Sequence, residues 1–75
     1  MKILIYNTKT GLYLADGDQW VEKAAVARDF QHASVAIHYA SIHNFADVEM
    51  TYAFPDPRYN FSTNIGANWL AREQS

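Results

Sequence analysis

The histidines are the first side chains of this sequence that could act as metal ligands or catalytic bases. His32, His38 and His43 are separated by six and five residues, whereas two ligands on one helical face need a spacing of three or four. Ser34 and His38 have the i, i+4 spacing of a nucleophile and its base, but no acidic residue is placed to orient the imidazole ring. We therefore expect structural or solvated histidines, no metal site and no catalytic residue.

The other motifs of active and binding sites are incomplete. Asp16-Gly17-Asp18 is similar to a fragment of a calcium loop, but the further acidic ligands are missing, which favours a hairpin turn. With no cysteine and only three glycines, the sequence excludes thiolate ligands, disulfides and a glycine-rich phosphate loop. We expect no cofactor and no enzymatic activity. An enzyme would need His38, Ser34 and a buried carboxylate to converge in one pocket.

Aromatic side chains are frequent, with two Trp, five Tyr and four Phe in 75 residues. Tyrosine and tryptophan are enriched at protein interfaces because they combine a large apolar area with a polar group. Stacking on nucleic-acid bases is the alternative use of such residues. The sequence favours core packing or a protein interface, and the candidate interface residues are Tyr6, Tyr13, Trp20, Tyr59, Trp69 and Leu70.

The charge distribution disfavours nucleic acid as a partner. Six Lys and Arg stand against eight Asp and Glu, a formal net charge of −2. The basic residues are scattered singly, whereas a phosphate-binding surface needs clusters of them. The apolar run at residues 3–6 is too short for a signal peptide or a membrane span. We expect a cytoplasmic protein without a membrane partner.

Two segments show the clearest periodicity and must position the rest. The alternation in residues 48–54 puts every second side chain, from Val48 to Phe54, on one apolar face, which predicts a half-buried strand. Residues 33–43 contain no Gly or Pro and carry apolar side chains at i, i+3, i+4 and i+7 from Ala33. This pattern predicts the main helix, with small residues that allow close approach to a sheet.

The N-terminal part is expected to form the rest of the sheet. Residues 2–7 and 12–15 are rich in β-branched, leucine and aromatic residues and flank a turn that contains Gly11, which predicts an antiparallel hairpin. Residues 19–22 can add a short third strand. Residues 23–30 are expected to form a connector with one helical turn.

The C-terminal part begins with a break. Two prolines in residues 55–58 end the strand, and residues 59–61 are expected to form an aromatic loop. Residues 62–72 begin with three capping residues, which favours a short helix carrying Trp69 and Leu70.

These elements predict an α+β fold, with an antiparallel sheet of three or four strands in ββ(β)αβ order and the main helix on one face. Residues 1–61 would form a single domain, and residues 62–75 a helical tail that docks on the body or on a neighbouring subunit. The predicted core consists of Ile3, Ile5, Leu12, Leu14, Phe30, Ala36, Ile37, Ala40, Val48, Met50 and Tyr52.

Part of the sequence resembles a group of short bacterial proteins. The segments Thr10-Gly11-Leu12-Tyr13-Leu14 and Ala27-Arg28-Asp29-Phe30, with Trp20 between them, are similar to their Thr-Gly-x-Tyr-Leu hairpin, Trp and Ala-x-x-Phe turn before a helix. The resemblance extends through residues 47–59 and covers most of the chain up to Phe61. It implies a ββαβ-like order and no functional residue.

The hairpin appears apolar on both faces, which bears on the partners. Leu4, Tyr6, Tyr13 and Val21 would lie on the sheet face opposite the helix, as a patch that monomers rarely leave exposed. If the tail covers this patch within its own chain, the protein is a monomer; if the tail or the face reaches a second copy, it is a two-fold dimer. We expect a homodimer, and a non-enzymatic protein-interaction or regulatory accessory module. The alternative is a nucleic-acid-binding module that uses aromatic residues on the sheet and loops.

Overall fold

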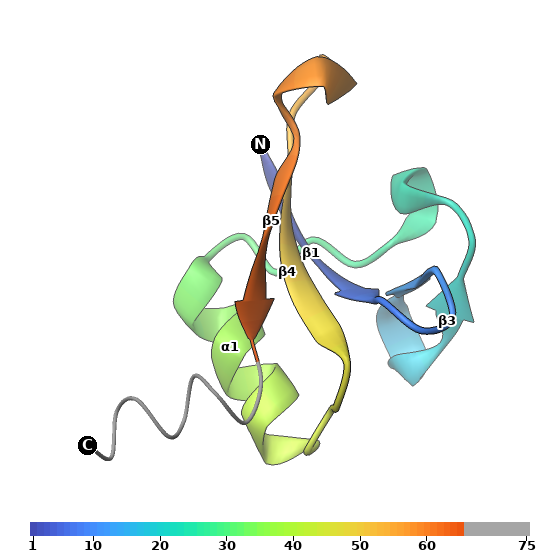
Figure 1. The fold of residues 1–75 in the computed structure, drawn as a ribbon, viewed down its shortest axis with the longest axis vertical. Helices are drawn as coiled ribbons and strands as arrows, with labels where there is room; N and C mark the ends of the chain where they lie inside the picture. The colour runs from blue at the N-terminus through green and yellow to red at the C-terminus, as the bar shows by residue number, and fades with distance from the viewer. Residues whose placement is uncertain (66–75) are drawn as a thin grey trace.

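A computed structural model describes residues 1–65 and shows an α+β fold, in which one antiparallel sheet packs against one long helix (Figure 1). The helix, α1, spans Ala33–Ile42. The strands are β1 (Lys2–Asn7), β2 (Leu12–Leu14), β3 (Trp20–Val21), β4 (Val48–Ala53) and β5 (Phe61–Ile65), and the single 3-10 turns are η1 (Asp16–Asp18), η2 (Ala24–Val26) and η3 (Pro57–Tyr59).

The central strands of the sheet, β1 and β4, are far apart in the sequence. The strand order is β3-β2-β1-β4-β5. β1 pairs with β4 along its whole length, from Lys2 to Asn7. It pairs with the shorter β2 only at Tyr6 and Asn7. The first half of β1 therefore has no strand on its β2 side.

The connector between η2 and α1 closes this open edge of β1. The N–H of Ile3 donates to Asp29 Oδ1 at 3.0 Å, and the carbonyl of Ile3 accepts from the N–H of Phe30 at 2.9 Å. Just before this point, the N–H of Arg28 donates to the carbonyl of Leu14 at 3.0 Å. The connector thus substitutes for a missing strand and brings Phe30 into the core.

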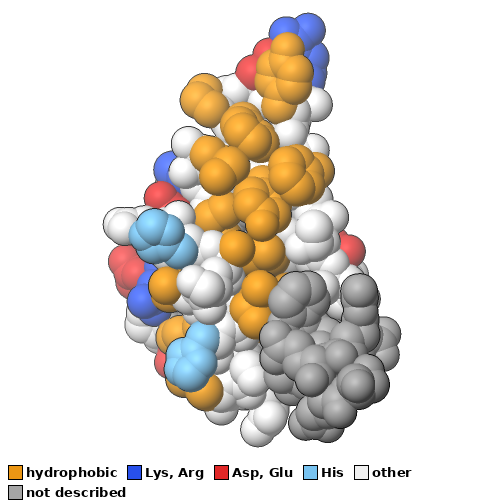
Figure 2. All heavy atoms as spheres, turned by 90° about the vertical axis from the view of Figure 1, so that its left-hand side faces the viewer, with side chains coloured by type: hydrophobic (Ala, Val, Ile, Leu, Met, Phe, Trp, Pro, Cys, Tyr) orange, Lys and Arg blue, Asp and Glu red, His pale blue; other side chains and the backbone are white. Residues whose placement is uncertain are grey.

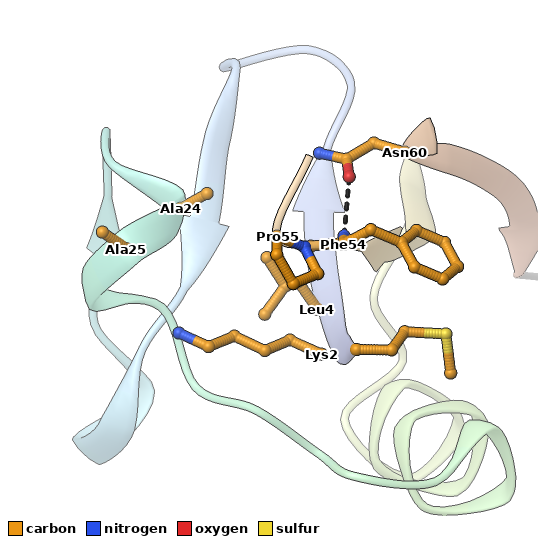
Figure 3. Close-up of a pocket in the computed structure, with 9 residues that line it drawn as sticks. Lys2, Leu4, Ala24, Ala25, Phe54, Pro55 and Asn60 are labelled. Carbon is orange, nitrogen blue, oxygen red and sulfur yellow. Dashed lines mark hydrogen bonds between the residues drawn. The ribbon is translucent and has the colours of Figure 1, made fainter. Parts of the chain in front are cut away.

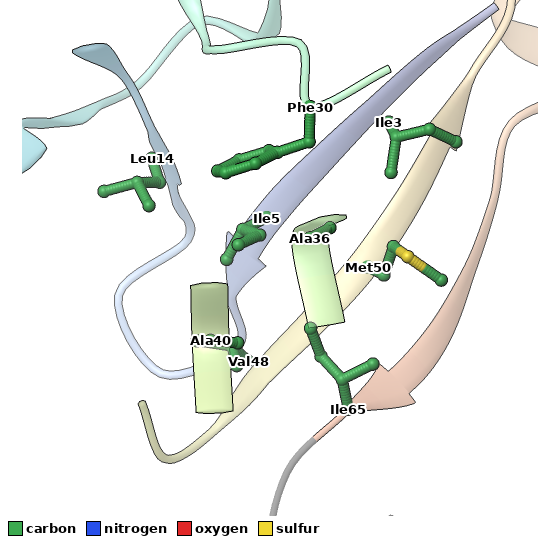
Figure 4. Packing of buried hydrophobic residues seen from close by; sticks show 9 residues of the cluster. All are labelled: Ile3, Ile5, Leu14, Phe30, Ala36, Ala40, Val48, Met50 and Ile65. Carbon is green, nitrogen blue, oxygen red and sulfur yellow. The ribbon is translucent and has the colours of Figure 1, made fainter. Parts of the chain in front are cut away.

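The hydrophobic core lies between the sheet and α1. Ala36 is 0% and Ala40 5% exposed, and their small side chains let the helix approach the strands closely. Ile5 and Met50 are cross-strand neighbours on this face. Figure 4 shows the whole cluster, which consists of Ile3, Ile5, Leu14, Phe30, Ala36, Ala40, Val48, Met50 and Ile65.

The predicted core is confirmed at most of its positions. Every residue of this cluster except Ile65 belongs to the core predicted from the sequence. Leu12, Ile37 and Tyr52 are half-buried rather than buried. Leu4, which we had placed on the opposite face, is also fully buried.

The sheet face opposite α1 is more covered than we predicted. Leu4 is 0% exposed and its cross-strand neighbour Thr51 only 8%. Tyr6, Tyr13 and Val21 are half-buried, and the rings of the two tyrosines lie 5.0 Å apart. The connector explains the difference, since its docking on β1 brings η2 to this side of the sheet. Within residues 1–65, these four side chains therefore do not form the large exposed patch that the sequence predicted.

The α+β class and the main helix are confirmed, but the predicted number and order of strands are wrong. The sheet has a fifth strand, β5, where the sequence predicted an aromatic loop and the start of a tail. The N–H of Phe54 donates to Asn60 Oδ1 at 2.7 Å, which closes the turn and brings Phe61 opposite Tyr52. The remainder of the predicted C-terminal helix lies outside the described residues.

We expect the Asp29 contact to make the stability of the fold decrease at low pH. Hydrogen bonds from the N–H groups of Ile3 and Gln31 lower the pKa of Asp29 below its ordinary 3.8. A carboxylate with a lowered folded-state pKa stabilises the fold above its unfolded pKa, and this contribution is lost as the pH falls through the folded pKa. Asp29→Ala should lower the free energy of unfolding at neutral pH by about 1 kcal/mol, a value kept small by solvent screening.

Denaturant unfolding between neutral and strongly acidic pH measures this effect. The difference in the free energy of unfolding between wild type and Asp29→Ala should decrease once the pH falls below the ordinary pKa of aspartate. The control is Glu22→Ala, since Glu22 is exposed and forms no ion pair or side-chain hydrogen bond within residues 1–65. If the difference in the free energy of unfolding is the same at every pH, the charge of Asp29 does not stabilise the fold through this contact.

Candidate interaction surface

The β4–β5 hairpin extends beyond the end of α1. The described chain is elongated, with extents of 37 × 25 × 21 Å, and Figure 1 shows this hairpin and its turn at one end of the long axis. α1 packs over Val48 and Met50 in the lower part of β4. Tyr52 lies further along the same face and is only half-buried. The end of the hairpin is therefore open on the helix side.

Three aromatic residues gather on this open part and form what we call the aromatic surface, Tyr52, Phe54 and Phe61. The rings of Tyr52 and Phe61, a cross-strand pair, are stacked at 4.5 Å with an interplanar angle of 14°. The ring of Phe54 lies 6.3 Å from that of Phe61. Phe61 is 51% exposed. Figure 2 shows hydrophobic side chains in a continuous band along this end of the molecule.

β5 also forms one edge of the sheet. Its sequence, Phe-Ser-Thr-Asn-Ile, has no charged residue and no proline, which are the usual means by which an edge strand avoids pairing with another chain. Ser62, Thr63 and Asn64 are exposed. Among residues 1–65, β5 pairs with β4 alone, so no strand in this part of the chain pairs with its outer backbone groups.

The turn of the hairpin is held by an ion pair. Asp56 accepts hydrogen bonds from Arg58, at 3.0 Å from the backbone N–H and at 2.6 Å from Nη2 to Oδ2. The side-chain bonds to Arg58, ahead of the backbone bond, lower the pKa of Asp56, and the same contact raises the pKa of Arg58. Tyr59 follows at the tip and is 65% exposed. The charges at the tip thus neutralise each other beside an exposed aromatic ring.

The structure does not bring the predicted interface residues into one surface. Tyr6 and Tyr13 are half-buried together on the face opposite α1. Trp20 packs against Phe45 on the helix side, with ring centroids 5.5 Å apart. Tyr59 lies at the tip of the hairpin. Trp69 and Leu70 lie outside the described residues, and their role stays a prediction.

Phe54 and Phe61 are not among the interface residues that the sequence predicts. Tyr52 was placed in the core, and Phe61 in a loop. The signal that could have found this surface is the alternation Phe61, Thr63, Ile65, which puts three side chains on one face of a strand.

A second aromatic cluster surrounds Tyr39 on α1. Its ring stacks on His43 at 4.2 Å, and its hydroxyl donates a hydrogen bond to Asp18. The guanidinium carbon of Arg28 lies 4.7 Å from the ring centre of Phe30 and 5.1 Å from that of Tyr39. The Asp18 hydrogen bond raises the pKa of Tyr39. The contacts of Tyr39 with Asp18 and Arg28 fasten η1 and the connector to the helix.

The side chains considered for catalysis and metal binding form no hydrogen bond with one another within residues 1–65. Ser34 and His38 are both exposed, and no hydrogen bond joins their side chains. Within residues 1–65, no group of three or more His, Asp or Glu side chains is arranged to hold a metal ion. No helix in that same part of the chain has the length and apolar character needed to cross a membrane.

Comparison of this chain with protein-family models, with characterised proteins and with solved structures found no match. The surface itself is therefore the basis for any functional assignment.

We expect the Tyr39 contact to be visible in an alkaline titration. The raised pKa means that the phenol stabilises the fold below the ordinary tyrosine value of 10.0, and that this contribution is lost as the pH rises through the higher folded pKa. Asp18→Asn should shift one tyrosine titration step to lower pH, measured by ultraviolet difference absorbance. Tyr39→Phe should remove that step, whereas Tyr59→Phe, the control, should keep it. An unchanged titration in Asp18→Asn would contradict the assignment.

Proposed function

We propose that this protein is a non-enzymatic interaction module that acts by binding another protein, and that its first partner is a second copy of itself. The carrying observation is that an uncharged, exposed edge strand and an exposed aromatic surface adjoin each other on one hairpin. Edge strands bind through main-chain hydrogen bonds, and neighbouring side chains add apolar area. Such a surface suits a regulatory or accessory protein.

A two-fold pairing of β5 with β5 of a second copy is self-complementary. If the axis passes beside Thr63, antiparallel pairing places Phe61 of one copy opposite Ile65 of the other, on the same face of a continuous sheet. The two aromatic surfaces then flank the new strand pair. The contact joins two strands that carry no charged residue.

The hairpin supports this dimer better than the face that the sequence favoured. On the face opposite α1, Leu4 is fully buried and offers no contact area. Phe61, by contrast, is 51% exposed beside the free edge. We therefore propose that the dimer contact is formed by β5.

The alternative of nucleic-acid binding gains no support from the charges. Lys9 pairs with Asp47 at 3.5 Å, Arg28 with Asp16 at 3.9 Å and Arg58 with Asp56 at 2.6 Å. These pairs neutralise three of the basic residues in the described part of the chain.

Charge complementation at Thr63 tests the dimer. Wild type should sediment at twice the 8.6 kDa of the chain at micromolar concentration. Thr63→Lys and Thr63→Glu should each be monomers, because like charges would face each other across the axis, and an equal mixture of the two should restore the dimer. Restoration by mixing shows that both variants are folded.

Phe61→Ser should weaken the dimer as well, because it removes exposed apolar area beside the axis. Val26→Ser is the matched control, since Val26 is 61% exposed on η2, away from the hairpin. A wild type that sediments at 8.6 kDa contradicts the dimer. A dimer that persists in both Thr63 variants places the contact elsewhere on the chain.

A further inference from the structure

A pocket lies on the sheet face opposite α1, away from the proposed dimer contact. Its volume is about 320 Å³, at the lower end of the range for small-molecule sites. Figure 3 shows it between η2 on one side and the start of the β4–β5 turn on the other. The lining residues are Met1, Lys2, Leu4, Ala24, Ala25, Ala53, Phe54, Pro55 and Asn60.

The pocket exists because small residues occupy its floor and one wall. Ala53 is the cross-strand neighbour of Lys2 and lies on the same sheet face as Leu4. Ala24 and Ala25 form the wall on η2. The Ala24 methyl group points toward Pro55 (Figure 3), so a larger side chain at this position would extend into the space. The ring of Pro55 stands opposite this wall (Figure 3). The interior is therefore apolar and suits a hydrocarbon or aromatic group.

Only two lining side chains are polar, and both present hydrogen-bond donors. Asn60 Oδ1 already accepts the N–H of Phe54 at 2.7 Å, so its amide N–H groups are left to donate. In Figure 3 the amide nitrogen of Asn60 points to the η2 side of the pocket. The ammonium group of Lys2 forms no ion pair within residues 1–65, and no acidic residue lines the pocket. A ligand that matches this lining carries acceptors and a negative charge.

We propose that this pocket binds a small amphipathic carboxylate. Its apolar body lies between Ala53, Pro55 and the alanines of η2, and its carboxylate pairs with the ammonium of Lys2. Asn60 donates to an acceptor at the opposite end, since Figure 3 shows Lys2 and Asn60 at the two ends of the pocket. This site does not depend on the proposed dimer, because no residue of β5 lines the pocket.

Two probes of the same shape and different charge test the proposal, naphthoate and its uncharged analogue naphthamide. Each is titrated into the full-length protein, and backbone amide chemical shifts are followed by NMR. Naphthoate should cause saturable shifts at Leu4, Ala25 and Ala53. It should bind more tightly than naphthamide, and added salt should reduce that difference.

Three variants distinguish the contribution of the Lys2 charge to binding from that of the pocket's shape. Lys2→Gln should weaken naphthoate binding by about three- to tenfold and leave naphthamide binding unchanged, as expected for the loss of one partly exposed ion pair. Ala24→Leu should abolish the shifts with both probes by filling the pocket; Ala24 is half-buried and lies outside the core cluster, so this change leaves the core intact. Lys9→Gln, the matched control in the β1–β2 turn, should bind both probes as wild type does.

The proposal is overturned if naphthoate gives no saturable shifts at the pocket, or if the shifts persist unchanged in Ala24→Leu. It is also overturned if the largest shifts fall on Tyr52 and Phe61, since the aromatic surface would then be the binding site. Equal affinity for the two probes in wild type would remove the role of Lys2.

Discussion

The hydrogen bonds of Ile3 with Asp29 and Phe30 are the contact on which the rest of the fold depends. β2 is only three residues long, so half of β1 would otherwise lack a neighbour on that side. A buried backbone N–H or C=O group without a partner destabilises the fold by about the free energy of one hydrogen bond. The connector satisfies them with one side chain and one backbone N–H. This docking fixes the path of the chain from β3 to α1.

The same docking explains how so short a chain can cover both faces of its sheet. Phe30 enters the core on the helix side and packs against Tyr39, with ring centroids 5.3 Å apart. η2, a few residues earlier, stands on the other side near Leu4. A chain of 75 residues has little apolar area to spare, and here an irregular segment supplies cover that a second helix would give in a larger domain. The pocket is the space that this cover leaves open.

The sequence predicted the elements whose pattern is local and missed the contacts that are not. The helix at Ala33–Ile42 and the strand at Val48–Ala53 follow from periods of 3.6 and 2 that a window of ten residues contains. β5 was missed because Ser62, Thr63 and Asn64 also fit a helix N-terminus, and only pairing with β4 decides between the two. Asp29 accepts a hydrogen bond from Ile3, 26 positions earlier. No pattern in the sequence around Asp29 indicates this contact.

The sequence predicted that aromatic residues would form a contact surface, but not which of them would be exposed. Abundant aromatics indicate contact area, yet whether Tyr6 or Phe61 is exposed depends on which face of the sheet η2 and α1 occupy. Trp20 illustrates the limit, since a short strand turns it inward against Phe45.

The pairing of β1 with β4 also has a consequence for how the chain folds. The partners Lys2 and Ala53 are separated by most of the described sequence, and closing so long a loop costs entropy before any core contact is gained. The β1–β2 hairpin, joined at two positions, is too small to persist alone in water. A ribosome must therefore release residues beyond Ala53 before β1 and β4 can pair along their whole length and the nascent chain can form its core.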